Sequence, residues 1–224
     1  MSALTSDIHR SYRDRLRILL IIYFFSQNIN EEEKEKSYYQ KEFKSEVRIQ
    51  KIDFLIRYPD YLAYELLDLL QYPKFEDYKE DIKANVKAIF GNKEPDIRRE
   101  DMLRFFYGAY EDIDHIIAFL VSIGFIEYSS KRNLAGRVFE KVYYLTEYGV
   151  SKIEREILIG LEKAKWYESR CNLIKKYFGD LSGTELKVRQ YEHEEYRATP
   201  LNQYIKGIQE DVRSKYQDIF GEEI

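Results

Sequence analysis

The chain has 224 residues, which is enough for one sizeable domain or for two small domains that each bury a core. Hydrophobic residues make up 44% of it and aromatic residues 16%, including 21 tyrosines, a composition typical of ordered globular proteins. The formal net charge of -4 and the pI near 5.6 argue against a protein built chiefly to coat nucleic acid, because that function needs an excess of lysine and arginine.

The single cysteine, Cys171, excludes an internal disulfide and a cysteine-based zinc site, and it fits a cytosolic protein. The longest apolar run, Ile18 to Phe25, is far shorter than the roughly twenty residues that a transmembrane helix needs. The amino terminus carries charge where a signal peptide has its apolar core. We therefore expect a cytoplasmic protein with no membrane partner.

Residues 1–94 are predicted to form an N-terminal helical domain, which ends at a linker around Pro95. Its first helix has apolar residues at spacings of three to four. The charged stretch from Asn28 to Glu42 is predicted to be an exposed loop or a solvated extension of that helix. Two helices then flank Pro59, and a third runs from about Phe75 to Phe90.

The segment 95–152 has the clearest pattern in the chain. It predicts two helices, a strand, a basic turn and a returning strand, in this order, over Ile97 to Tyr107, Glu111 to Ile123, Phe125 to Tyr128, Ser129 to Gly136 and Val138 to Leu145. This order is typical of a winged helix. The predicted fold is therefore mainly α with a small β-wing: a winged helix-turn-helix domain flanked by N-terminal helices and by a C-terminal helical region with one long helix.

The C-terminal region, residues 153–224, is predicted to contain that long helix and a helical hairpin. The long helix is expected to run from Thr146 to Phe178, with a seven-residue apolar repeat that only Gly160 interrupts. Such an apolar seam needs a partner helix. The partner is either a helix of another protein or an internal helix, at Thr184 to Tyr196 or at Leu201 to Phe220. The internal bundle is favoured because the repeat covers few heptads.

The second helix of the predicted winged helix, Tyr110 to Ile123, is the element that would read DNA. It carries Glu111, Asp112 and Asp114 and no lysine or arginine, so its amino-terminal end would repel phosphates. Two basic clusters are candidates for phosphate contacts that read no sequence, although a charged turn is more often simply solvated. They are Lys131, Arg132, Arg137 and Lys141 in or beside the wing, and Arg10, Arg13, Arg15 and Arg17 on the first helix.

No catalytic, metal-binding or cofactor-binding pattern appears in the sequence. The histidines His9, His115 and His193 have no metal-ligand spacing, and the segment Tyr191 to Glu195 is more simply an exposed charged helix face. No nucleophile elbow or phosphate-binding glycine loop is present, and Cys171 is expected to be a packing residue. We expect no enzyme and no cofactor. A metal-dependent nuclease remains a disfavoured alternative.

The stretch Lys51-Ile-Asp-Phe-Leu-Ile-Arg-Tyr-Pro59, followed by Leu62, resembles a segment of the middle-component proteins of three-component ABC systems. These small winged-helix proteins are encoded between an SMC-like ATPase and an effector, and they include the small subunit of Lamassu-type anti-phage systems. The chain length and the predicted winged helix at about Ile97 to Lys152 also fit, whereas the insertion at Asn28 to Glu42 and the long C-terminal helices do not map.

The resemblance implies a non-catalytic adaptor that joins the ATPase to an effector, often a nuclease, in defence against phage or plasmids, with double-stranded DNA contacted through the complex. Tyrosine and arginine often anchor protein interfaces, and six candidates for such contacts are Arg57, Tyr58, Tyr110, Tyr167, Ile174 and Phe178. A related architecture is the tandem winged helix of SMC complexes, with Arg48 to Phe90 as a first, wingless copy. The alternative function is a winged-helix transcriptional regulator that binds DNA.

Overall fold

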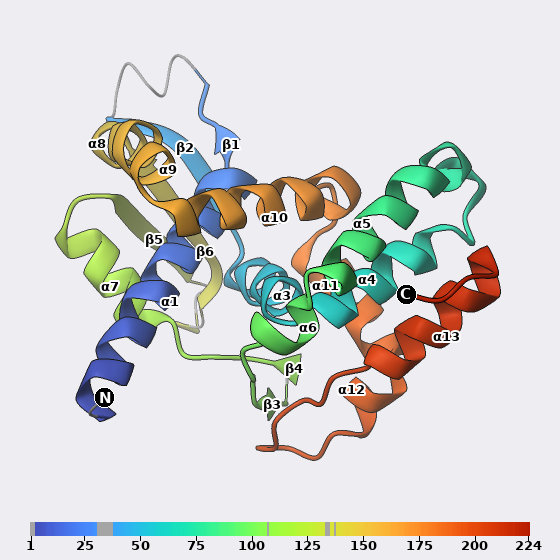
Figure 1. Cartoon of the computed structure of the whole chain (residues 1–224). Helices are drawn as coiled ribbons and strands as arrows, with labels where there is room; N and C mark the ends of the chain where they lie inside the picture. The colour runs from blue at the N-terminus through green and yellow to red at the C-terminus, as the bar shows by residue number, and fades with distance from the viewer. Residues whose placement is uncertain (1–2, 31–37, 107, 133–134, 137) are drawn as a thin grey trace. The chain divides into compact units, whose positions relative to one another are not determined.

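The structure is a computed structural model that describes residues 3–30, 38–106, 108–132, 135–136 and 138–224 (Figure 1). It is mostly helical with a small antiparallel sheet, which confirms the predicted class at this level. The chain forms two compact units, each made of two segments: unit 1 from Met1–Asp53 and Asp112–Leu186, and unit 2 from Phe54–Glu111 and Lys187–Ile224. These units do not follow the predicted boundaries near residues 94 and 152.

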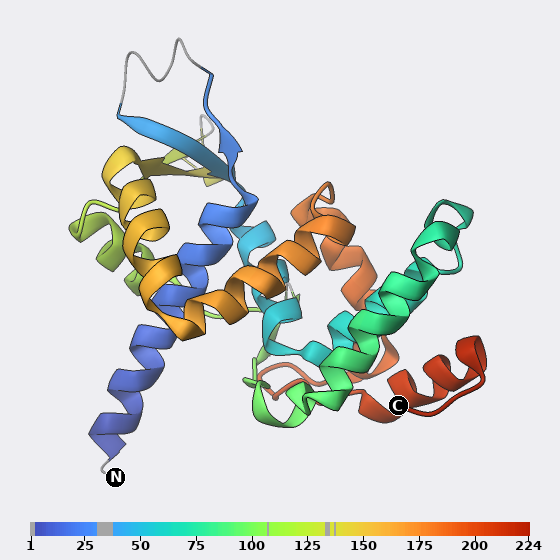
Figure 2. The same cartoon turned by 45° about the horizontal axis from the view of Figure 1, so that its top comes forward.

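Unit 1 is built around α1 (Ala3–Phe25), whose consecutive residues Ile18 to Ile22 are all buried. A helix that is apolar on every side must have neighbours on every side. Here α1 packs against α7 (Asp114–Ser122), against α10 (Glu162–Phe178), and against the strands β2 (Tyr39–Lys44) and β6 (Val138–Thr146). Both views show α10 crossing α1 (Figure 1 and Figure 2). No helix in the described ranges has the length and apolarity that a membrane span requires.

The sheet of unit 1 has four antiparallel strands in the order β1-β2-β6-β5. The hairpin of β5 (Ile126–Arg132) and β6 (Val138–Thr146) confirms the two strands expected there, but β5 continues to Arg132, so the turn predicted from Ser129 is wrong for residues 129–132. By contrast, β1 (Gln27–Asn28) and β2 (Tyr39–Lys44) overlap the stretch predicted to be a loop or helix extension, so that prediction is wrong for residues 39–42. The strand forms there because it pairs with β6, in a register that places Phe43 opposite Tyr143 and shifts between Tyr39 and Lys41.

The long helix predicted from Thr146 to Phe178 is wrong. The chain forms α8 (Glu147–Lys152), a π-helical turn η2 (Ile153–Ile157) and the short α9 (Leu158–Gly160), and it then leaves the helix at Leu161, where φ is -111° and ψ is 111°. Glycine is a poor helix former, and its place at the end of α9 coincides with this break. The apolar seam of α10 packs within the chain, as favoured, but its partner is α1 and not a C-terminal helix.

Unit 2 is centred on α4 (Pro59–Leu69), which packs against both α5 (Lys79–Gly91) and α13 (Gln209–Phe220). The 3-10 helix η1 (Pro73–Tyr78) precedes α5, and α12 (Glu194–Ala198) precedes α13. Two helices run across the boundary between the units: α3 (Glu46–Arg57) and α11 (Gly183–Glu192).

The helix predicted from Ile97 to Tyr107 is also wrong. That segment holds the end of α6 (Glu94–Ile97) and the strand β3 (Arg104–Phe105), which pairs with β4 (Gly108–Ala109). Gly108 has a φ of 93°, a backbone conformation that glycine adopts readily and that other residues rarely do. The segment 95–152, expected to form one winged helix, is therefore divided, because β3 and β4 belong to unit 2 whereas α7, β5 and β6 belong to unit 1.

Candidate functional site

The amino-terminal end of α4 lies at the centre of unit 2. Pro59 begins the helix because its fixed φ suits the first helical position, and the preceding Tyr58 is extended, with φ -122° and ψ 80°. Most of α4 is buried, including its polar residues Asp60 and Glu65. Because a buried polar group without a partner costs free energy, these side chains need partners inside the protein.

Three buried side chains from this region bind the backbone of residues 205–208. The Tyr58 hydroxyl donates to the Ile205 carbonyl oxygen at 3.0 Å and accepts from the Met102 N–H at 2.9 Å. The Tyr61 hydroxyl donates to the carbonyl oxygen of Lys206 at 3.2 Å, and a carboxylate oxygen of Asp60 accepts from the Ile208 N–H at 2.6 Å. These bonds fix the path of a segment that has no regular secondary structure of its own.

Two segments, one at residues 102–105 and one at residues 202–205, bind each other through their backbones. The Arg104 N–H donates to the Gln203 carbonyl at 2.9 Å, and the Arg104 carbonyl accepts from the Asn202 N–H at 2.8 Å. The Ile205 N–H donates to the Met102 carbonyl at 3.1 Å. At the far side of the β3–β4 pair, the Ala109 N–H donates to the hydroxyl of the buried Tyr196 at 2.5 Å.

These two segments and the residues next to them, Phe106 and Leu201, carry large apolar side chains that are exposed. Phe106 is 78% exposed and Tyr204 60%, and Leu201 and Phe105 are exposed at 42% and 38%. The Phe105 ring also meets the ring of the half-buried Tyr110 edge-on at 5.7 Å. We call Phe105, Phe106, Leu201 and Tyr204 the aromatic surface. Exposed aromatic residues on a fixed backbone are typical of surfaces that bind proteins, because little conformational entropy is lost on binding.

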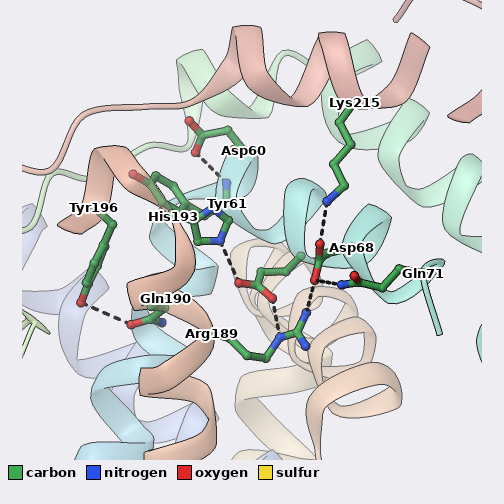
Figure 3. Close-up of polar contacts among 10 residues, drawn as sticks. Asp60, Tyr61, Asp68, Gln71, Arg189, Gln190, His193, Tyr196 and Lys215 are labelled. Carbon is green, nitrogen blue, oxygen red and sulfur yellow. Dashed lines mark hydrogen bonds and ion pairs between the residues drawn. The ribbon is translucent and has the colours of Figure 1, made fainter. Parts of the chain in front are cut away.

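A network of ion pairs joins α4 to the C-terminal segment of unit 2 (Figure 3). One carboxylate, Glu65, contacts Arg189 at 2.5 Å and His193 at 2.8 Å, through different oxygens. The other, Asp68, contacts Lys215 at 2.6 Å and Arg189 at 3.3 Å. His193 therefore has a structural partner. In the part of the chain that the structure describes, no three acidic, histidine or cysteine side chains are placed to hold a metal ion.

Five of the six residues predicted to contact a partner protein are buried, so the prediction is wrong for Arg57, Tyr58, Tyr167, Ile174 and Phe178. Arg57 donates to the carbonyl oxygens of Glu100, at 3.0 Å, and Asp101, at 2.7 Å, and it pairs with Glu111. Arginine and tyrosine serve equally well as interface anchors and as buried hydrogen-bond donors, and sequence does not distinguish these uses.

The candidate phosphate contacts are not all available. The prediction is wrong for Arg17, which is 1% exposed and contacts Asp53 at 2.5 Å and Asp14 at 2.8 Å. On the same helix Arg10 is exposed and Arg13 half-buried, and in the hairpin Lys141 pairs with Glu46 and, at 3.4 Å, with Asp114. The backbones of Lys131 and Arg132 lie at the end of β5, and Arg137 lies outside the described residues.

The helix expected to read DNA is α7. Its exposed residues include Asp114, His115, Ala118 and Val121, and it contains no lysine or arginine. From α1, the Arg15 guanidinium lies 3.9 Å from the centre of the Phe119 ring, where it packs as a cation against an aromatic face. The helix α7 thus has no lysine, arginine, asparagine or glutamine, the side chains that most often read base edges.

Comparison of the chain with protein-family models, with curated proteins and with solved structures found no match. The aromatic surface was missed at the sequence level, although one signal points to it. The run Arg104-Phe-Phe-Tyr-Gly108 places consecutive aromatic residues before a glycine, a pattern that favours a turn with exposed rings over a helix.

Replacement of Tyr58 by phenylalanine is expected to lower the free energy of unfolding by about 1 to 3 kcal/mol, because the buried Met102 N–H loses its acceptor. Burial raises the pKa of Tyr58 to about 12, so at neutral pH the hydroxyl keeps the proton that it donates to Ile205. Urea unfolding measures the loss, and amide exchange should show Met102 less protected. The control is Tyr204→Phe, at an exposed ring, with no change expected.

Proposed function

We propose that this chain is a non-catalytic adaptor subunit that binds partner proteins through the aromatic surface of unit 2. In this proposal it is a cytoplasmic component of an SMC-like ABC ATPase complex that defends against phage or plasmids, and it links the ATPase heads to an effector nuclease. The observation that carries the proposal is the exposure of Phe106 and Tyr204 on segments that buried side chains hold in place.

The chain order of unit 1 supports the winged-helix part of the proposal. A winged helix runs helix, strand, helix, helix, strand, strand, and its last strand lies between the other two. In unit 1 the order α1, β2, α3, α7, β5, β6 and the strand order β2-β6-β5 follow this scheme. We therefore infer a winged helix that is interrupted between its second and third helices by residues 54–111.

In that arrangement α7 is the helix that a DNA reader would place in the major groove. Its first turn carries Asp114, and its exposed positions include Ala118 and Val121. Close approach to phosphates would bring like charges together, whereas small and apolar side chains suit contact with protein. The winged module thus favours a protein partner, as the resemblance to the middle components of three-component ABC systems also implies.

The single cysteine of the chain lies in the core of unit 1. Cys171 is fully buried on α10, and burial raises the pKa of its thiol far above the ordinary value. A protonated, buried thiol packs as a small apolar group. This agrees with a role in which the chain contributes surfaces and no chemistry.

The test is recovery of partners by the tagged full-length chain, co-expressed with the proteins encoded beside it. We expect a large coiled-coil ATPase to co-purify, and we expect Phe106→Asp and Tyr204→Asp each to reduce its recovery at least tenfold. A charge at the centre of an apolar contact loses its water without gaining a partner. The matched control is Tyr72→Asp, the same change at another exposed tyrosine of unit 2, with recovery unchanged.

Circular dichroism should show that all three variants are folded. Wild-type recovery by both Phe106→Asp and Tyr204→Asp would remove the aromatic surface from the proposal, and the absence of any ATPase partner would remove the adaptor role.

The second candidate function is a winged-helix transcriptional regulator, which the element order of unit 1 favours. It predicts that the isolated chain binds one duplex sequence tightly, with an affinity that falls steeply with salt. A gel shift with a nanomolar site would place this function ahead of the adaptor role.

A further inference from the structure

The strand β5 forms one edge of the sheet in unit 1. Its inner side pairs with β6, and among the residues that the structure describes no other strand pairs with its outer side. The seven residues of β5 include neither proline nor glycine, and its pairing with β6 is regular from Ile126 to Lys131, with a shift in register between Lys131 and Arg132. A strand edge of this length without proline is a template for a further strand, and proteins commonly cover such an edge or pair it.

The sequence of β5, Ile-Glu-Tyr-Ser-Ser-Lys-Arg, is complementary in charge to itself when read in the opposite direction. In an antiparallel pair, opposite residues point to the same face of the sheet. A twofold axis between identical strands therefore lies midway between the two copies of one residue, which stand opposite each other. With the axis at Ser129, Glu127 of each copy stands opposite Lys131 of the other copy. An axis at Tyr128 or Ser130 pairs no opposite charges within the strand.

The side chains near this axis favour the same arrangement. The Glu127 carboxylate accepts a hydrogen bond from the Tyr39 hydroxyl of β2 at 2.6 Å, which orients it on the sheet. Ser129 is exposed, and Tyr128 is 53% exposed while its ring stacks on that of Tyr143. An oriented carboxylate and a supported, exposed tyrosine on an unpaired edge are suited to cross-strand contacts.

We propose that β5 pairs antiparallel with β5 of a second copy of this chain, about a twofold axis at Ser129. The pairing joins two four-stranded sheets into one continuous sheet, and it places the oppositely charged residues Glu127 and Lys131 in register at two positions. Because like charges that stand opposite each other destabilise a strand pair, this charge pattern also disfavours a shifted register. The inference concerns the edge of unit 1 and is independent of the adaptor role.

The test uses the full-length chain, with sedimentation velocity as the readout. The wild type should be a concentration-dependent dimer. The variants Glu127→Lys and Lys131→Glu should each dimerise at least tenfold more weakly, because every charged position then faces its own sign. An equimolar mixture of the two variants should recover the dimer, since each opposed pair in the mixed dimer again contains one lysine and one glutamate.

This recovery separates pairing from folding, because a variant that simply failed to fold would not be rescued by the other. The matched control is Glu162→Lys, the same change at an exposed residue of α10, which should dimerise like the wild type. Three results would overturn the proposal: a wild type that stays monomeric at every concentration, single variants that dimerise like the wild type, or folded variants whose mixture remains monomeric.

Discussion

Asp53→Ala should lower the free energy of unfolding by about 3 to 5 kcal/mol, the usual cost of removing one partner of a buried ion pair. Asp53 on α3 is 1% exposed and contacts Arg17 on α1, which is 1% exposed as well. The guanidinium keeps its contact with Asp14, but the charge on its Nε side loses its counterion inside the core. The fluorescence of Trp166, the single tryptophan, reports urea unfolding of unit 1 from α10.

Two further variants show whether this loss comes from burial of an unpaired charge. Arg10→Ala removes an arginine from the same helix at a side chain that is 57% exposed, and it should change stability by less than about 0.5 kcal/mol. Arg17→Met combined with Asp53→Leu removes both charges, and most of the stability should return. A single Asp53→Ala variant as stable as Arg10→Ala would mean that water reaches Arg17.

Ile174→Asp should unfold unit 1 or destabilise it by about 4 kcal/mol or more, because it removes core packing and places a charge where none can be solvated. Ile174 is fully buried on α10, which packs against α1. A loss of this size is a large part of the net stability of an ordinary domain. Trp166 fluorescence and thermal melting measured by circular dichroism are the suitable measurements.

The control for this variant is Asn172→Asp, two residues earlier on the same helix at an exposed position. It adds the same charge to α10 and should leave the melting temperature unchanged within a few degrees. If Ile174→Asp melted at the same temperature as this control, the seam of α10 would have to face solvent.

The elements with strong local patterns were predictable from the sequence. The hairpin of β5 and β6 is flanked by turn residues and rich in β-formers, and α7 has a clear apolar period. The ends of α4 follow from Pro59 and from the Tyr72-Pro73 stop. In each case a few neighbouring residues contain the whole signal.

The parts that depend on distant partners were not predictable. The charged strand β2 has one buried residue, Phe43, and it forms through pairing with β6, about a hundred residues later in the sequence. No local sequence signal marks the division into units either. Residues 54–111 separate the two segments of unit 1, and neither boundary has a glycine-rich or proline-rich linker. Propensity and periodicity describe neighbours along the chain and contain no information on such pairings.

The candidate site shows the same limit. Tyr58 looks like an interface anchor in the sequence, yet it is fully buried and bonded to Ile205 and Met102. Phe106 falls in a stretch whose spacing suggested a helix, yet it is 78% exposed beside a strand. The expected burial of these two residues is thus reversed. Which of them is buried depends on residues 199–208, which lie about a hundred residues or more away in the sequence.

The two-segment construction of unit 2 has a consequence for synthesis on the ribosome. Several contacts that hold residues 102–109 come from Tyr196, Gln203 and Ile205, and α4 packs against α13, where Lys215 pairs with Asp68. Residues 54–111 therefore emerge from the exit tunnel long before the residues that complete their core. During translation, unit 2 can therefore complete its core only after residues 187–220 have been synthesised, and until then residues 54–111 keep apolar side chains exposed that the folded unit buries.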